Sequence, residues 1–380
     1  MTSLNPPQMG APYMAEDDHS DNNLDHRLDH QSDPLIDSSL TLKKLLIVTD
    51  AWQPQVNGVV RTLGNTRDQL QRKGMTVEML TPQTFTTLPC PSYPEIRLSL
   101  THAGQVKRII EEINPDALHI ATEGPLGWAA RRAALKQGWQ FTTAYHTRFP
   151  EYVKARIGVP LDWSYALFRL FHGPASAVLA PTPAIVEDLR SRGFGQVVHW
   201  TRGVDHEIFY PRIEQKPIRK ENPIFLYAGR LAVEKNVEAF LKLDLPGQKW
   251  VAGEGPMAAS LKKKYPEARY IGVISQDELA NLYSEADVFV FPSVTDTFGL
   301  VMVEAMACGL PVAAFPVPGP IDVVGDSGAG VLSDDLRQAC LDCLDVEREQ
   351  AIKRASHFTW PIATDQFFAA LKPMRARKES

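Results

Sequence analysis

The sequence predicts an α/β protein with two doubly wound parallel sheets, and three observations lead to this fold class. The chain has 380 residues, which is too long for one ordinary hydrophobic core and indicates two domains. From residue 43 onward, short apolar runs alternate with helical stretches, as parallel strands and their connecting helices do. At residues 212–223 the polar and basic stretch RIEQKPIRKENP interrupts this alternation, which then begins again, as expected of an interdomain linker.

The elements of the first half follow in order along the chain. Residues 43–50, KKLLIVTD, form an apolar run that ends at a polar tip, which predicts a buried parallel strand. The loop AWQPQVNGV leads into a helix that reaches about Arg72, because Gly74 stops it. The further elements expected here are strands at residues 76–80, 116–120, 141–145 and 197–200, and helices at residues 103–113 and 126–136.

The second half repeats the same rhythm. We expect strands at residues 224–227, 249–252, 270–271, 287–291 and 311–315, and helices at residues 237–243, 257–264 and 276–285. Ser275 is the expected N-cap of the third of these helices. A further helix should begin near Phe298 and end at Gly309, where a glycine followed by Pro311 indicates a C-terminal stop.

The N-terminal segment differs in composition from the rest of the chain. The net charge of the chain is −5; eight acidic residues and one arginine give residues 1–40 a charge of −7, which leaves +2 on the remainder. The segment is poor in apolar residues, so we expect a disordered acidic leader. It lacks the apolar core of a secretory signal, and no run in the chain approaches the ~20 apolar residues of a membrane span.

Cysteine usage indicates a reducing compartment. The chain has four cysteines, Cys90, Cys308, Cys340 and Cys343. One Cys-x2-Cys pair without a second pair argues against a zinc site, and reduced thiols are the default. We therefore expect a cytoplasmic protein, with peripheral contact at the inner face of the membrane left open.

The segment at residues 292–312, PSVTDTFGLVMVEAMACGLPV, carries two carboxylates eight positions apart, Asp296 and Glu304. Glu304 falls inside the predicted helix and is flanked by apolar residues on both sides. Because burying an unpaired charge is costly, we expect Glu304 to have a partner rather than to face solvent.

This segment closely resembles the Glu-x7-Glu motif of glycosyltransferase family 4, the retaining transferases with the GT-B fold. Asp296 stands where the family usually has Glu, whereas FGLV, EAMA and CGLPV fit well. The resemblance covers nearly all of residues 43–372 and is strongest to the branch of mannosyltransferases and diacylglycerol glycosyltransferases. It implies two Rossmann-like domains that face each other across a cleft, and a C-terminal helix that crosses back to the first domain.

The expected division of the chain has five parts. They are an acidic leader (1–42), an N-terminal Rossmann-like acceptor domain (43–211), a linker (212–222), a C-terminal Rossmann-like nucleotide-sugar domain (223–358), and the crossing helix and tail (359–380).

Candidate site residues lie at the carboxyl ends of predicted strands, where ligands bind in open α/β sheets. Arg230 and Lys235 follow the first strand of the second half, and their charges suit a nucleoside diphosphate leaving group. His146 follows an apolar strand and should point into the cleft. Asn57 and Gly58 precede a helix whose N-terminus is a ready anion site.

The resemblance assigns roles to these positions. It implies that Arg230 and Lys235 hold the diphosphate, that His146 and Asp296 face the donor sugar, and that Glu304 accepts hydrogen bonds from both ribose hydroxyls. The four expected catalytic residues are His146, Arg230, Lys235 and Asp296. Further donor contacts are expected from Gly58 at the diphosphate, Gly253 beneath the nucleotide, Ile274 at the base, and the amides of Phe298 and Gly299 at sugar oxygens or phosphate. The acceptor side is expected to comprise Asn57, Glu123, Gly124 and His146.

The chain contains no Asp-x-Asp pair, the motif with which other transferases hold a divalent ion. We therefore expect no metal and no other cofactor, with Arg230, Lys235 and a helix dipole in place of the ion. The resemblance implies a front-side retaining reaction in which the leaving phosphate deprotonates the acceptor, so that no protein base is required.

The acceptor is indicated by residues 152–171, a segment that mixes basic and aromatic residues. They are Lys154, Arg156, Trp163, Tyr165, Phe168, Arg169 and Phe171. Such a mixture suits an anionic membrane surface, and an ordinary amphipathic helix packed on the sheet explains it equally well. Together with TEGPLG, which contains Glu123 and Gly124, and HTRFPEYV, the segment most resembles the lipid branch.

The predicted function is transfer of a hexose from GDP-mannose, UDP-glucose or UDP-glucuronate to a membrane glycerolipid such as diacylglycerol. One alternative is a GDP-mannose-dependent α-mannosyltransferase that acts on a glycan or a polyprenyl-type acceptor, and another is a GT-B sugar-nucleotide epimerase. The expected partners are the nucleotide sugar and a lipid or glycan acceptor, with no nucleic acid.

Overall fold

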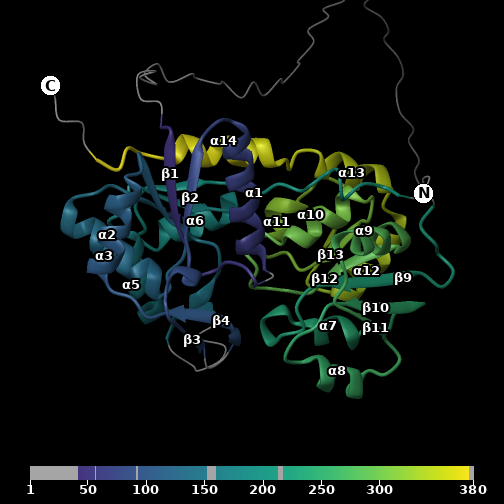
Figure 1. Ribbon diagram of the computed structural model, residues 1–380. Coiled ribbons are helices and arrows are strands. Elements are labelled where there is room, and N and C mark those ends of the chain that lie inside the picture. The colour runs from purple at the N-terminus through teal and green to yellow at the C-terminus, as the bar shows by residue number, and fades with distance from the viewer. Residues whose placement is uncertain (1–41, 56, 91–92, 152–159, 213–216, 376–380) are drawn as a thin grey trace, which may run out of the picture. The chain divides into compact units, whose positions relative to one another are not determined.

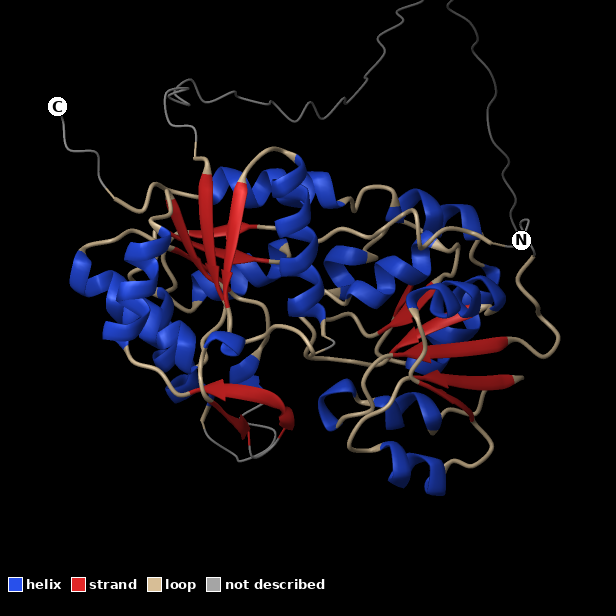
Figure 2. Cartoon of the chain, in the orientation of Figure 1, coloured by secondary structure: helices blue, strands red, loops and turns tan. Residues whose placement is uncertain are grey.

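Two parallel six-stranded sheets organise the molecule (Figures 1 and 2). The computed structural model describes residues 42–55, 57–90, 93–151, 160–212 and 217–375. The expectations for the acidic leader and for Lys154 and Arg156 therefore fall outside the described residues, as does part of the predicted linker. The two sheets confirm the predicted α/β class with two doubly wound halves.

The first sheet has the strand order β2-β1-β5-β6-β7-β8. Its strands are β1 (Lys44–Val48), β2 (Thr76–Leu80), β5 (Ala117–Ile120), β6 (Thr142–Ala144), β7 (Ala177–Ala180) and β8 (Val197–His199). Strand β1 is fully buried from Leu45 to Val48, as expected of a parallel strand covered on both faces. Its helices are α1 (Gly58–Arg72), α2 (Ala103–Ile113), α3 (Pro125–Gln137), α5 (Leu161–His172) and α6 (Pro183–Ser191).

The second sheet has the order β11-β10-β9-β12-β13-β14. Its strands are β9 (Ile224–Ala228), β10 (Gln248–Ala252), β11 (Arg269–Gly272), β12 (Val288–Phe291), β13 (Val312–Ala314) and β14 (Gly330–Leu332). The helices of this half are α7 (Val237–Leu241), α8 (Ala258–Lys264), α9 (Gln276–Glu285), α10 (Leu300–Ala307), α11 (Pro320–Val323), α12 (Leu336–Asp342) and α13 (Arg348–Ala355), and the chain then continues into the terminal helix α14 (Trp360–Ala370). The predicted cap of α9 is confirmed, because Ser275 and Glu278 form a capping box.

Each sheet has an apolar core on both of its faces. Helices α1 and α14 cover one face of the first sheet, and α2, α3, α5 and α6 cover the other (Figure 1). In the second sheet, α9, α10 and α13 cover one face, and α7, α8 and α12 cover the other. The division predicted at residues 212–222 falls between β8, the last strand of the first sheet, and β9, the first strand of the second.

The terminal helix α14 returns to the first half, as the resemblance implied. Phe367 is fully buried and shares an apolar cluster with Leu45 and Leu63. Gln366 accepts a hydrogen bond of 2.8 Å from the backbone of Thr201. Beyond the helix, Arg375 donates to Asn114 at 2.7 Å. The last described residues are thereby attached to the first half.

One local expectation differs from the structure, and one element was not predicted. The motif helix α10 begins at Leu300 rather than near Phe298, because Gly299 adopts φ +83° and the Phe298 side chain is buried against Phe358. The antiparallel hairpin of β3 (Thr87–Cys90) and β4 (Tyr93–Ser99) was not expected. Its sequence holds three prolines, which argue against strands when the sequence is considered alone.

Candidate active site

The site is assembled at the carboxyl ends of parallel strands, where ligands bind in open α/β sheets. His146 lies two residues after β6, and Arg230 lies two residues after β9. Asp296 lies in the loop that follows β12. Three of the four predicted catalytic residues thus follow strands of the two sheets. The contacts described next connect two of them, His146 and Asp296, with Lys235.

The loop between β12 and α10 contacts both halves of the molecule. Lys235 Nζ lies 2.5 Å from Asp296 Oδ1, so two of the predicted catalytic residues form an ion pair. The neighbouring Thr297 donates its hydroxyl hydrogen to the backbone oxygen of His146 at 2.7 Å. Lys235, Asp296 and His146 therefore belong to one connected group of contacts.

Glu304 has the charged partner that its apolar flanks require. Its side chain is 3% exposed, and Oε1 lies 2.6 Å from the guanidinium of Arg61, whose side chain is 30% exposed. Arg61 is on α1 of the first half, one turn after Gly58, and Glu304 is in the middle of α10. A carboxylate buried to this degree needs such a partner, because the loss of solvation is offset only by close pairing.

A polar cavity of about 70 Å³ lies beside this ion pair. Its lining comprises Arg61, Asn65, Gly203, Val204, Asp205, Gln276, Leu300, Glu304 and Trp360. Residues of both halves contribute to this lining. A β-carbon built on Gly58 would lie 3.7 Å from Leu300 Cδ1, so α1 and α10 approach closely at the same place.

Three buried polar atoms of the site lack a hydrogen-bond partner among the described residues. They are His146 Nε2, Asp296 Oδ2 and Glu304 Oε2. Buried polar side-chain atoms in proteins are nearly always paired, so each such atom requires an explanation. Hydroxyl groups and oxygens of a bound sugar nucleotide would pair with an imidazole and two carboxylates of this kind.

The glycines of the second half keep its loops in close contact. A β-carbon on Gly253 would lie 2.0 Å from the backbone oxygen of Gly229, at φ +127°. The amide of Gly253 donates to Gly272 at 2.7 Å. Gly272 begins the loop that contains the half-buried Ile274. Gly229, Gly253 and Gly272 thus allow the loops after β9, β10 and β11 to pack directly against one another.

The two helix N-termini of the site differ in how their amides are satisfied. Asn57 is the N-cap of α1, and its side-chain oxygen accepts from the amides of Val59 and Val60 at 3.0 Å. No side chain of the described residues caps the N-terminus of α10, where Gly299 occupies the N-cap position. A helix N-terminus favours anions. The first amides of α10 are therefore available to an anionic ligand, whereas those of Val59 and Val60 in α1 already donate to Asn57.

The predicted acceptor residues Glu123 and Gly124 are held by Asp50 and His172. Asp50, at the end of β1, accepts from the amides of Leu126 and Gly127 at 2.9 and 3.1 Å. A β-carbon on Gly124 would lie 2.3 Å from Asp50 Cγ, so only glycine fits there. Burial raises the pKa of Asp50. Glu123 Oε1 pairs with His172 Nε2 at 3.1 Å and is thereby oriented by a buried imidazole.

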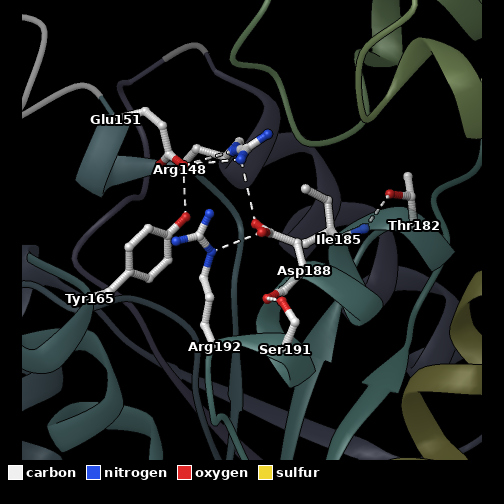
Figure 3. Close-up of polar contacts among 8 residues, drawn as sticks. All are labelled: Arg148, Glu151, Tyr165, Thr182, Ile185, Asp188, Ser191 and Arg192. Carbon is white, nitrogen blue, oxygen red and sulfur yellow. Dashed lines mark hydrogen bonds and ion pairs between the residues drawn. The ribbon is translucent and has the colours of Figure 1, made fainter. Parts of the chain in front are cut away.

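The loop after His146 is anchored by a network of ion pairs (Figure 3). Arg148 contacts Glu151 at 3.0 Å and Asp188 at 3.4 Å. The hydroxyl of Tyr165 donates to Glu151 at 2.7 Å. Because Asp188 belongs to α6 and Tyr165 to α5, this network connects the His146 loop to two helices of the first half.

Sequence reasoning missed Arg61, Asp50, Thr297 and Arg202. Asp50 was at the polar tip of a predicted strand, which was an available signal. Arg61 and Arg202 had no comparable signal, because their partners Glu304 and His146 are distant in the sequence. Among the described residues, no group of three or more His, Cys, Asp or Glu side chains is arranged to hold a metal ion, and no helix there is long and apolar enough to cross a membrane.

Comparisons with known proteins identify both halves. Residues 56–208 match the model described as Glycosyltransferase Family 4, and residues 211–339 match the model described as Glycosyl transferases group 1. The chain is 28% identical over 370 residues to a GDP-mannose-dependent alpha-mannosyltransferase of Mycobacterium tuberculosis, covering 88% of this chain and 98% of the relative. It is 26% identical over 372 residues to an alpha-monoglucosyldiacylglycerol synthase of Streptococcus pneumoniae, covering 84% and 82%.

Solved structures support the same fold. Sucrose-phosphate synthase of Thermosynechococcus elongatus superposes with a TM-score of 0.69 at 21% identity, covering 86% of this chain and 98% of that one. At that identity the likeness concerns the fold. The two family models together cover most of the chain, and each matches one of the two halves. This protein is therefore a glycosyltransferase of family 4 with the GT-B fold, and it transfers a sugar from a nucleotide sugar.

Proposed function

We propose that this enzyme transfers a hexose to a membrane glycerolipid such as diacylglycerol. The observation that carries this proposal is the outer face of α5. Trp163, Leu167 and Leu170 are 76%, 53% and 59% exposed and follow helical spacing, so they form one apolar stripe on the surface. A contiguous apolar stripe on a helix is typical of a surface that binds a partner or a membrane interface.

The stripe differs from the pattern on which the membrane expectation was based. Tyr165 and Phe171 are buried, and Phe168 is partly buried in the same apolar cluster, so these aromatic residues pack on the sheet. Arg169 donates to the backbone of Arg192 at 3.1 Å. Of the four predicted aromatic residues only Trp163 faces solvent. Leu167 and Leu170 complete the outer face.

The helix α3, which contacts α5, carries exposed positive charges. Arg131 of α3 donates to the backbone oxygen of Phe171 at 2.9 Å, which fixes α3 against α5. Arg132, the next residue of α3, and Lys136, about one turn later, are exposed to solvent. Exposed basic residues favour an anionic membrane surface, since each basic residue near such a surface contributes about 1 kcal/mol. This surface belongs to the half that the resemblance assigns to the acceptor.

For the donor, we propose that Arg230 and Lys235 hold the diphosphate, that His146 and Asp296 face the hexose, and that Glu304 accepts from the ribose. The three partnerless atoms of His146, Asp296 and Glu304 support this assignment. The two cations and the uncapped N-terminus of α10 would stabilise the charge of the leaving diphosphate, so we propose that no metal is needed. The leaving phosphate would take the acceptor proton, and the hexose would keep its anomeric configuration.

A second candidate is a GDP-mannose-dependent α-mannosyltransferase that acts on a glycan or a polyprenyl-type acceptor. It is favoured by the relative of Mycobacterium tuberculosis, which carries the name GDP-mannose-dependent alpha-mannosyltransferase and covers 88% of this chain. The two candidates share the donor site and differ in the acceptor.

Thermal unfolding with a panel of ligands in the presence of EDTA tests the donor site. GDP, UDP, GDP-mannose, UDP-glucose and UDP-glucuronate are compared at equal concentration. A ligand at 100 times its dissociation constant adds about 2.7 kcal/mol to the folded state, which gives a measurable shift. We expect one nucleotide and its sugar to raise the unfolding temperature without metal. If none of the five ligands gives a shift, the proposed donor site is wrong.

Vesicle flotation tests the acceptor surface. We expect wild-type protein to float with phosphatidylglycerol vesicles, and the triple variant Trp163→Ser, Leu167→Ser, Leu170→Ser to stay in solution. The matched control changes Ile362 and Phe368, two exposed apolar residues of α14, to serine and should float like the wild type. If the triple variant floats as well as the wild type, the apolar stripe does not bind membranes and the lipid proposal loses its support.

A further inference from the structure

A buried arginine contacts the imidazole that we place against the donor sugar. Arg202 is 3% exposed and lies just after β8. Its Nη1 donates to the backbone oxygen of Thr201 at 3.0 Å and to that of Trp200 at 2.5 Å. Its guanidinium lies 4.1 Å from the centre of the Trp200 ring. Its Nη2 lies 3.4 Å from His146 Nδ1.

This arginine has no carboxylate partner among the described residues. Its contacts are two backbone oxygens, an indole ring and an imidazole, all of which are uncharged. Burial lowers the pKa of Arg202 to about 9, so the residue remains a cation at neutral pH. A buried charge without a counter-ion costs stability and is retained where it has a use.

The contact between Arg202 and His146 determines which imidazole nitrogen carries the proton. A guanidinium has five N–H donors and no acceptor, so Nδ1 of His146 has to accept. Burial and the nearby Arg202 cation, followed by His119 and His172, hold the pKa of His146 well below its usual value, and the ring is therefore neutral. A neutral imidazole carries one proton. With Nδ1 accepting, that proton is on Nε2.

Nε2 is the ring nitrogen of His146 that has no hydrogen-bond partner among the described residues, and it is enclosed. The backbone oxygen of His146 accepts a hydrogen bond of 2.7 Å from the Thr297 hydroxyl, in the loop that also carries Asp296. The imidazole and the Trp200 ring pack edge to face, with ring centres 5.6 Å apart. The backbone and the ring of His146 are thus both held by neighbouring residues.

We propose that Arg202 is a positioning residue for the donor sugar: it donates to Nδ1 of His146 and thereby keeps the imidazole proton on Nε2, where it is donated to an oxygen of the transferred hexose. This inference rests on the proposed function, which places His146 against the hexose. It gives His146 the role of a hydrogen-bond donor and excludes it as the base that accepts the acceptor proton, because Nε2 is already protonated.

The first test determines the tautomer directly. Full-length protein with ¹⁵N-labelled histidine is studied by long-range ¹H–¹⁵N correlation, and the His146 signals are assigned by their loss in His146→Gln. We expect the proton on Nε2 in the wild type and a shift towards the Nδ1 form in Arg202→Met. Arg202→Lys keeps a donor at Nδ1 and should retain the Nε2 form. A proton on Nδ1 in the wild type would overturn the proposal, as would an unchanged tautomer in Arg202→Met.

The second test uses kinetics and a double-mutant cycle. Glutamine can present an N–H near the position of Nε2 without help from Arg202. We therefore expect Arg202→Met to lower kcat/KM for the nucleotide sugar about 10- to 100-fold in the wild-type background and less than about threefold in the His146→Gln background. Equal losses in both backgrounds would show that Arg202 acts independently of His146 and would contradict the proposal.

Two further measurements separate this inference from the proposed function. The nucleoside diphosphate lacks the hexose, so Arg202→Met should keep the full thermal shift with the nucleotide that stabilises the wild type. If the wild type binds no nucleotide, the proposed function fails; if it binds and transfers but the tautomer is wrong, only the role of Arg202 fails. The control Arg354→Met removes an arginine that also donates to two backbone oxygens and covers a ring, that of Phe358, while its guanidinium pairs with no histidine side chain of the described residues. It should leave kcat/KM within about twofold.

Discussion

Removal of Arg61 should leave a buried carboxylate without its partner. Glu304 is 3% exposed, and its charged partner is the Arg61 guanidinium at 2.6 Å. Breaking a buried ion pair by truncating one member costs about 3–5 kcal/mol. Since the Arg61 side chain is 30% exposed, water already weakens the pair, and we expect the lower end of that range. Arg61→Met should therefore reduce the free energy of unfolding by about 3 kcal/mol.

Urea unfolding followed by far-UV circular dichroism measures this loss. The series comprises the wild type, Arg61→Met, Glu304→Gln and the double variant. Because the two groups are in contact, the double variant should be more stable than the sum of the single losses predicts, with a coupling of about 1–3 kcal/mol. Arg72, which is exposed in the last turn of the same helix, supplies the matched control, and Arg72→Met should change stability by less than about 0.5 kcal/mol.

The reasoning is refuted if Arg61→Met unfolds like the Arg72→Met control. It is also refuted if the losses in the two single variants simply add, because the pair would then contribute no coupling energy.

Three further predictions follow from the same contacts. Lys235→Ala removes the cation that lies 2.5 Å from Asp296 and should lower kcat by about 10²-fold or more in a transfer assay, while urea unfolding shifts by less than about 1 kcal/mol; intact turnover would exclude Lys235 from the site. Thr297→Val leaves the His146 backbone oxygen unpaired and should reduce the unfolding free energy by about 1–3 kcal/mol; it should also raise KM for the nucleotide sugar, and an unchanged KM would show that this contact does not position His146. Gly253→Ala would place a β-carbon 2.0 Å from the Gly229 oxygen and should destabilise the fold by about 2 kcal/mol or more, whereas Gly64→Ala, which meets nothing within 4 Å on α1, should stabilise it by about 0.5–1 kcal/mol; comparable thermal unfolding of the two variants would contradict the loop packing.

Much of the fold could be predicted because buried parallel strands are continuous apolar runs. The stretch LLIV of β1 is one example, and the strand predicted at residues 76–80 is found as β2 with the same ends. The capping box at Ser275 is a local signal and was found for the same reason. The hairpin of β3 and β4 could not be predicted, because prolines in a sequence argue against strands. The sequence alone does not show that these two strands pair only with each other.

The site could be predicted in part, where its residues follow strands or lie in the motif. Asp296, Lys235 and His146 were expected together and are connected by the loop after β12. Glu304 was expected to have a partner, but no spacing in the sequence points to Arg61 on a helix of the other half. The same holds for Arg202. Arg202 follows the end of a predicted strand, which gives no indication of a site. Its contact with His146 joins residues 56 positions apart and forms only in the folded first sheet.

The most direct test of the central claim is a transfer assay on vesicles that contain diacylglycerol. Purified protein is incubated in EDTA with each of GDP-mannose, UDP-glucose and UDP-glucuronate, and the lipid extract is examined by mass spectrometry and by NMR of the anomeric proton. We predict a hexosyl diacylglycerol from one donor, with the anomeric configuration of that donor retained. If the enzyme consumes a donor only when a glycan or a polyprenyl acceptor is supplied, and leaves diacylglycerol unchanged, the proposed acceptor is wrong.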